Sequence, residues 1–279
     1  MIIDSHQHFW QYEADKHSWI EDDMSGIRKD FMPDDLKKVY ETNNIEGCVA
    51  VQADQTLEET DFLLDLADKN DFIKGVVGWV DLGAKNIEEV LEKYSKYPKL
   101  KGFRHVVQGE PDHNFLLRPN FLRGIAALKK YDFTYDILVL PHQLGAVLEL
   151  VKRFPNQKFV IDHIAKPYIK DGFYDGWAAL MFEIGKCKNV YCKLSGMVTE
   201  ADYTTWTPAQ IKPYMKLVLV AFGWKRVMFG SDWPVCLVAA NYKNVKELVT
   251  GFIANLNSTE QASIMGANAK IFYNLEIKL

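Results

Sequence analysis

The stretch Met1-Ile2-Ile3-Asp4-Ser5-His6-Gln7-His8-Phe9-Trp10 places two β-branched residues directly before a His-x-His pair and two aromatic residues. Alternate side chains of a strand share a face, so we expect His6 and His8 to point the same way. Two imidazoles in this arrangement can hold one metal ion or one substrate oxygen. The pair alone fits a solvated strand end equally well, so its meaning depends on how the later strands end.

The same unit, a short apolar run followed by a helical pattern, recurs along the whole chain. Helix starts are marked by Pro33, by Thr56 with Glu59 three residues later, by Pro119 and by Pro208. Further helices are predicted over 86–97, from His142 to 154, over 177–187, and after 232. Counting the opening stretch, eight strands are predicted, the others over 47–52, 72–80, 100–106, 133–140, 158–163, 190–194 and 226–232.

Apolar strands that alternate with helices indicate a parallel sheet covered on both faces. Eight such units in 279 residues favour an α/β fold of the (β/α)8 TIM-barrel type over an open doubly wound sheet. The sequence holds neither GxGxxG nor a P-loop motif, which lowers the case for an open nucleotide-binding sheet. No linker-like gap interrupts the pattern, so residues 1–279 are predicted to form one domain.

Composition narrows the classes of partner. A formal net charge of −4 gives no electrostatic footprint for nucleic acid or anionic lipid. The chain opens on a strand rather than a secretion signal, and no apolar run is long enough to cross a bilayer, so we expect a cytoplasmic protein without membrane contact. The cysteines lie in apolar surroundings and are expected to be buried thiols; they are Cys48, Cys187, Cys192 and Cys236.

In such a barrel the catalytic groups gather at the carboxyl ends of the strands. This chain places most of its histidines there, which random scatter would not do. The polar or aromatic residues expected at these ends are His6, His8, Gln52, Arg104, His105, His142, His163, Lys193, Ser195, Asp232 and Trp233.

Four segments resemble signatures of the amidohydrolase superfamily. They are Ile3–Trp10, Gly102-Phe103-Arg104-His105, Ile161-Asp162-His163-Ile164-Ala165-Lys166-Pro167 and Phe229-Gly230-Ser231-Asp232-Trp233-Pro234. The chain is most similar to the lactonase branch, which includes sugar-acid lactonases and pyrone-dicarboxylate hydrolases. The similarity runs from the first strand through the eighth.

The resemblance implies that His6, His8 and His163 are the site histidines and that Asp232 activates water. One departure matters, because binuclear members carry a carboxylated lysine on the fourth strand, whereas this strand ends in Phe103–His105. A two-metal site is therefore not expected. The implied alternatives are one divalent ion, zinc first among the candidates, held by His6, His8, His163 and Asp232, or a metal-independent site.

Hydrolysis of a lactone needs a general base for water and a positive environment for the developing oxyanion. We therefore expect a hydrolase that opens the lactone of a sugar acid or a related small carboxylic acid, with Asp232 as base. Arg104 is predicted to anchor a carboxylate or a sugar hydroxyl, an interior ion pair being the alternative. Further substrate contacts are predicted for His142, Gln52, Lys166 and Trp233, against ordinary loop or packing roles.

Two rival readings remain at this point. The same barrel serves metal-dependent decarboxylases in neighbouring branches of the superfamily, and a non-catalytic binding protein would leave the histidine set without a purpose. The expected partner is a small-molecule lactone. Formation of a homo-oligomer is left open by the sequence.

Overall fold

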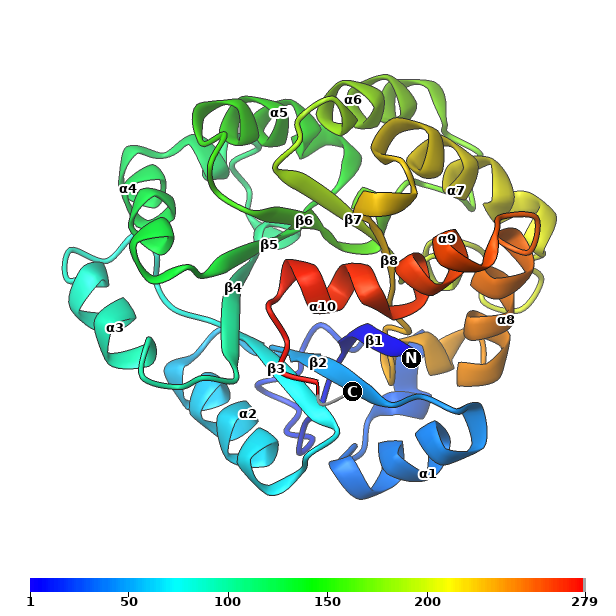
Figure 1. The fold of residues 1–279 in the computed structure, drawn as a ribbon, viewed down its shortest axis with the longest axis horizontal. Coiled ribbons are helices and arrows are strands. Elements are labelled where there is room, and N and C mark those ends of the chain that lie inside the picture. Colours follow the sequence, from blue (N-terminus) through cyan, green and yellow to red (C-terminus); the bar gives the residue numbers. More distant parts are fainter. Residues whose placement is uncertain (278–279) are drawn as a thin grey trace.

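In the computed structural model, which describes residues 1–277, one sheet of eight parallel strands runs in the order β1 to β8 (Figure 1). The prediction of a (β/α)8 barrel is confirmed. The strands are β1 (Ile3–Gln7), β2 (Gly47–Val51), β3 (Ile73–Gly78), β4 (Leu100–Val106), β5 (Thr134–Leu138), β6 (Phe159–Ile161), β7 (Val190–Leu194) and β8 (Val227–Phe229).

A ring of helices surrounds the strands, one after each strand (Figure 1). These helices are α1 (Pro33–Asn43), α2 (Leu57–Lys69), α3 (Ile87–Tyr94), α4 (Pro119–Leu128), α5 (Leu144–Arg153), α6 (Asp175–Gly185), α7 (Pro208–Phe222) and α8 (Tyr242–Phe252). Two short helices, α9 (Ser258–Ala262) and α10 (Asn268–Phe272), follow, joined by a π-helical turn. No helix among the described residues is both long enough and apolar enough to span a bilayer.

The helix starts predicted from proline and capping residues agree with the structure. Pro33, Pro119 and Pro208 each occupy the first turn of their helix. Thr56 caps α2 by accepting a hydrogen bond from the Glu59 backbone N–H. The Glu59 carboxylate does not return to Thr56 but accepts from the Ala53 backbone N–H at 2.8 Å, which ties the β2–α2 loop to the helix.

The barrel closes between β1 and β8 at one end only. The Asp232 backbone N–H donates to the His6 carbonyl at 2.8 Å, and the His8 N–H donates to the Trp233 carbonyl at 2.7 Å. An isolated parallel bridge joins Gln7 and Trp233. The seam is therefore fastened at the carboxyl ends of the first and last strands.

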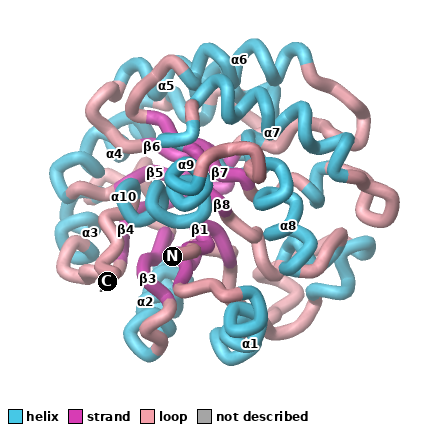
Figure 2. The backbone as a smooth tube through the Cα atoms, turned by 45° about the vertical axis from the view of Figure 1, so that its right-hand side comes forward, coloured by secondary structure: helices cyan, strands magenta, loops and turns pink. Residues whose placement is uncertain are grey.

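The opposite end of the barrel is filled by apolar side chains. Helix α10 covers this end and lies in front of the strands in both Figure 1 and Figure 2. Strand residues Ile3, Val49, Val160 and Met228 pack there against Phe272, all at most 1% exposed. Burial of this apolar surface stabilises the barrel at the end covered by α10.

Five strands are shorter than predicted: the second, third and fifth, expected over 47–52, 72–80 and 133–140, and the two that precede site residues. The sixth, expected over 158–163, spans Phe159–Ile161, and the eighth, expected over 226–232, spans Val227–Phe229. Left-handed backbone begins soon after each, with φ of 53° at His163 and 59° at Asp232. Because consecutive left-handed residues cannot continue a ladder, the strand pattern stops before the polar residues.

Candidate active site

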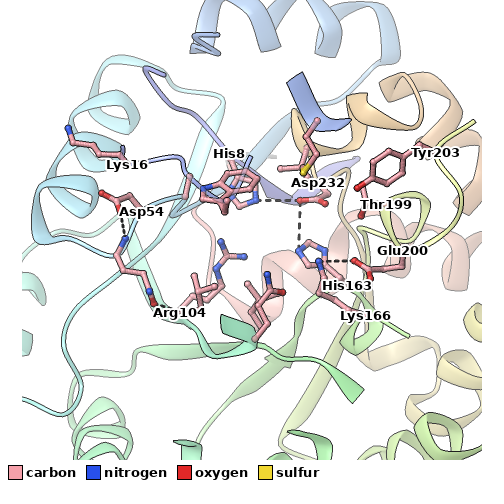
Figure 3. Close-up of a pocket in the computed structure, with 18 residues that line it drawn as sticks. His8, Lys16, Asp54, Arg104, His163, Lys166, Thr199, Glu200, Tyr203 and Asp232 are labelled. Atoms are coloured by element: carbon pink, nitrogen blue, oxygen red, sulfur yellow. Dashed lines mark hydrogen bonds and ion pairs between the residues drawn. The ribbon is translucent and has the colours of Figure 1, made fainter. Parts of the chain in front are cut away.

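A cavity of about 420 Å³ opens at the carboxyl ends of the strands (Figure 3). This volume lies in the range of small-molecule sites. Its lining comes from the loops after several strands and includes His8, Trp19, Asp54, Gln55, Arg104, Gln108, His163, Lys166, Thr199, Glu200, Tyr203 and Asp232.

Three imidazoles converge on Asp232 at the floor of this cavity. The Asp232 Oδ1 atom lies 3.4 Å from His8 Nε2, 3.8 Å from His163 Nε2 and 3.9 Å from His6 Nε2. All four side chains are at most 5% exposed. The sequence placed these residues on three different strand ends, and the structure brings them together.

The outer ring nitrogens are held by the protein. His8 Nδ1 lies 2.8 Å from the Val51 carbonyl, which can only accept, so this nitrogen carries the proton. His163 Nδ1 contacts Ser195 Oγ at 2.9 Å, and His6 Nδ1 contacts Asp162 Oδ1 at 3.3 Å. Each ring therefore turns Nε2 toward Asp232, the arrangement typical of metal-ligating histidines.

This donor set fits a divalent cation. With Nδ1 turned to the Val51 carbonyl, His8 places Nε2 3.2 Å from His6 Nε2 and 3.4 Å from the Asp232 carboxylate. Imidazole nitrogens and a carboxylate that face one another in this way are satisfied by a cation between them, and they are the ligand types that zinc takes. One ligand atom from each of His6, His8 and Asp232 can be chosen so that all lie within 4.8 Å of one another.

Local backbone geometry delivers His163 to this point. Residues His163 to Lys166 all have positive φ, a conformation that is costly for non-glycine residues. Gly196, at φ 59°, lets the neighbouring loop approach, because a Cβ atom there would lie 2.4 Å from His163 Nδ1. Strain of this kind is found at functional sites.

The charges of these groups are set by burial and by one another. Burial opposes ionisation of Asp232, but the nearby His163 and His8 rings outweigh it and hold the pKa of Asp232 below its usual value. Burial lowers the pKa of His6 and of His163 well below the ordinary histidine range. At neutral pH the site thus combines an ionised Asp232 with neutral imidazoles at His6 and His163.

Arg104 reaches the cavity wall but is engaged by the protein itself. Its guanidinium donates to the Gln52 Oε1 atom at 2.7 Å, to the Gln52 carbonyl and to Asp162 Oδ2 at 3.2 Å. The predicted alternative of an interior ion pair is present. Gln52 is fully buried and does not line the cavity, so it supports Arg104 where a substrate contact was predicted.

A buried charge cluster beneath the histidines was missed by sequence reasoning. Lys193 was noted at a strand end without a role, and Asp136 and Asp162 were given none, yet all three are 0% exposed. Burial raises the pKa of Asp136 to about 6. Burial also opposes ionisation of Asp162, but Lys193 and His6 hold its pKa well below the usual value. The sequence did hold a signal for this cluster, because charged residues are rarely found inside apolar strands.

Lys166 lines the cavity as predicted, paired with Glu200 at 2.7 Å. Burial disfavours its charged form, but Glu200 outweighs this and raises the pKa of Lys166. Figure 3 shows the pair beside His163, on the wall below Asp232.

Three other residues lie away from the cavity. Trp233 is 2% exposed and packs edge-to-face against Phe31, so it fills the core where a substrate-stacking role was predicted. His142 is exposed and contacts His113 instead of the lining. His105 points away from the barrel axis, as the alternation with Arg104 requires, and bonds Glu110 at 2.8 Å.

A family model described as amidohydrolase matches residues 3–275 of the chain. The protein belongs to the amidohydrolase family. This amidohydrolase is similar to an L-fucono-1,5-lactonase of Burkholderia multivorans, with 39% identity across 98% of the chain and 96% of that relative.

Solved structures agree with this placement. An amidohydrolase of Burkholderia multivorans, solved with bound zinc, superposes with a TM-score of 0.94 at 38% identity, over 99% of this amidohydrolase and all of that chain. A dihydroxybenzoic acid decarboxylase of Polaromonas, covering 99% of this chain and 98% of its own, has a TM-score of 0.71 at 12% identity. At that identity the second likeness shows the fold alone.

Proposed function

We propose that the protein hydrolyses a sugar-acid lactone that is itself uncharged. The observation that carries the proposal is the convergence of His6, His8 and His163 on an ionised Asp232 at the floor of a 420 Å³ cavity. A general base among neutral imidazoles is what addition of water to a cyclic ester requires. The L-fucono-1,5-lactonase with 39% identity supports the same substrate class.

Asp232 acts as the general base in this reaction. Its lowered pKa keeps it ionised near neutrality, so it can take a proton from a water molecule held against the carbonyl carbon. The water oxygen bonds to that carbon, the ring C–O bond breaks, and the proton returns from Asp232 to the departing ring oxygen. The product is the open-chain hydroxy acid.

His6, His8, His163 and Asp232 would hold a divalent ion, zinc by the choice of ligands and by the zinc-bound relative. When bound, such an ion supplies Lewis-acid polarisation of the carbonyl. Around it, Val51, Ser195 and Asp162 orient the three rings.

The charge balance of the cavity favours a neutral lactone over one that carries a carboxylate. The described lining contains the cations Lys16, Arg104 and Lys166. Each is already paired with an acid, at 2.6 Å to Glu13, 3.2 Å to Asp162 and 2.7 Å to Glu200 respectively. A substrate carboxylate would have to break one of these pairs, of which Arg104–Asp162 is buried and Lys166–Glu200 is partly buried, and would leave a charge unpaired.

Sugar hydroxyls find both donors and acceptors in the same lining. Asp54 and Glu200 accept hydrogen bonds, Lys166 donates them, and Gln55 and Gln108 do both. A site that hydrogen-bonds each hydroxyl discriminates against analogues that lack one.

The experiment is an assay of the purified protein on neutral aldonolactones, including L-fucono-1,5-lactone, alongside a pyrone dicarboxylate and a dihydroxybenzoate. We expect turnover of the neutral lactones, and a loss of about 10²- to 10⁴-fold in kcat for Asp232→Asn. Asp65→Asn, an exposed aspartate on α2, is the matched control and should keep wild-type activity.

Two outcomes would defeat the proposal. Decarboxylation of the benzoate without lactone turnover would move the protein to the lyase class. Full activity of Asp232→Asn would remove the assigned base even if lactones are hydrolysed.

A further inference from the structure

A chain of buried polar groups runs from the last helix, α10, to the underside of the active site. Tyr273, directly after α10, is 1% exposed, and its ring belongs to the apolar cluster that fills the closed end of the barrel. Its hydroxyl does not stay in that cluster but donates to Asp136 Oδ2 at 2.6 Å. Two charged residues, Lys193 and Asp162, lie between this point and His6.

The links are short and continuous. Lys193 Nζ donates to Asp136 Oδ2 at 2.6 Å and lies 2.9 Å from Asp162 Oδ1. Lys193 Nζ and the same Asp162 oxygen both lie near His6 Nδ1, at 3.1 Å and 3.3 Å respectively. The last helix and the first strand are thus joined through Tyr273, Asp136, Lys193 and Asp162.

Asp136 depends on this arrangement for its orientation. Its Oδ1 atom has no hydrogen-bond partner among the described residues, so the carboxylate is held only through Oδ2, by Tyr273 and Lys193. Lys193 in turn has a flexible side chain, and the two carboxylates decide where its ammonium group sits. Desolvation of buried charges costs free energy, so stability alone does not account for this cluster.

We propose that Tyr273 is a positioning residue for His6. Through Asp136 and Lys193, its hydroxyl fixes the Asp162 carboxylate against His6 Nδ1, and so aims His6 Nε2 at Asp232. The inference rests on the proposed function in so far as His6 serves there as a ligand for zinc. Groups that orient metal-ligating histidines in this way typically contribute about 10- to 100-fold to metal affinity or activity.

The test compares two tyrosine-to-phenylalanine variants of the full chain. Tyr273→Phe removes the hydroxyl but keeps the ring in the apolar cluster and over Lys193, whose Nζ lies 5.5 Å from the ring centroid. Tyr94→Phe is the matched control, because Tyr94 is likewise buried and donates to a carboxylate, Asp61 Oδ1, at 2.9 Å, but on the outer helices. The readouts are zinc affinity by competition with a chelating dye, kcat and KM on the lactone, and thermal unfolding.

We expect Tyr273→Phe to bind zinc about tenfold more weakly and to lose kcat in the same proportion, with KM changed less than about twofold. Tyr94→Phe should lower the unfolding temperature but keep zinc affinity and kcat. If both variants retain wild-type zinc affinity and kcat, the hydroxyl is purely structural and the inference is wrong.

Failure of the proposed function is distinguishable from failure of this inference. If the wild-type protein opens no lactone but binds zinc, the proposed function fails and the zinc affinities of the two variants decide the inference. If it opens lactones without binding zinc, the kcat values decide it. A wild-type protein with neither property overturns both.

Discussion

The two ends of the barrel are built from the same strands but from different chemistry. On β1, Ile3 packs into the apolar cluster under α10, and three residues later His6 faces Asp232. On β8, Met228 belongs to the closed end, and Asp232 follows shortly after the strand. At about 3.3 Å per residue, some 10 Å separates a side chain that stabilises the fold from one that performs the reaction. The comparison teaches that a single strand serves both purposes: its first residues stabilise the fold, and the residues at its carboxyl end carry the chemistry.

The largest effect is expected at the closed end. Met228→Ala removes a fully buried side chain from the cluster under α10 and should lower the free energy of unfolding by about 2–5 kcal/mol. Activity per folded molecule should stay within about twofold of wild type, as measured by chemical denaturation alongside the lactone assay. Met228→Leu, which keeps the volume, is the control and should cost less than about 1.5 kcal/mol. A large loss of kcat in folded Met228→Ala would break the division between the two ends.

The converse effect is expected at the open end. Gly196→Ala introduces a Cβ atom 2.4 Å from His163 Nδ1, so the ring must move, and kcat should fall by about a hundredfold. Gly172→Ala is the matched control, because Gly172 also has positive φ, 68°, but no atom within 4 Å of the added carbon. Steady-state kinetics of both variants separate displacement of His163 from backbone strain. Equal kinetics in the two would contradict the role given to Gly196.

A smaller effect concerns pH and the loop that forms one cavity wall. Burial raises the pKa of Glu59 to about 7, whereas the unfolded chain has an ordinary glutamate. At pH values between the pKa of Glu59 in the unfolded chain and its pKa in the folded protein, the folded protein keeps a proton that the unfolded chain releases. The free energy of unfolding therefore falls as pH rises. We expect a loss on the order of 2 kcal/mol between about pH 5 and pH 8.

Glu59→Gln should remove this part of the pH dependence, because the amide still accepts from the Ala53 N–H and cannot ionise. The exposed neighbour Glu58→Gln is the control and should keep the wild-type profile in urea titrations at the two pH values. An unchanged profile in Glu59→Gln would place the pH dependence elsewhere.

The smallest effect is expected from His142→Ala. This histidine is exposed and contacts His113 and Tyr168, not the cavity lining. Both kcat and KM should therefore stay within about twofold of wild type, which is the scale of surface substitutions. A rise in KM beyond this would restore the substrate contact that the sequence predicted for His142.

The fold could be predicted because its signal is repeated. Eight apolar runs alternating with helical patterns leave few architectures, and each unit supports the same conclusion. Element bounds were less accurate where backbone conformation departs from the regular. The left-handed residues after β6 and β8 have ordinary side chains, and nothing in His163 or Asp232 announces a positive φ.

The site was predictable in its outline and not in its supports. His6, His8, His163 and Asp232 lie at strand ends or within three residues of them, so strand order alone brings them to one edge. Trp233 and Gln52 also follow strands, but the direction of a side chain beyond a strand end depends on backbone angles that the sequence does not reveal. Asp136 and Tyr273 were missed because one lies inside an apolar run and the other comes from a terminal helix that no strand-end rule includes.

The seam between β1 and β8 sets the order of events during synthesis. His6 and His8 can meet Asp232 only after the last strand has left the ribosome and closed the barrel. A nascent chain that has emerged as far as β7 carries all three histidines but lacks Asp232, which follows β8. Under the proposed function, the general base therefore joins the histidines only in the final stage of folding.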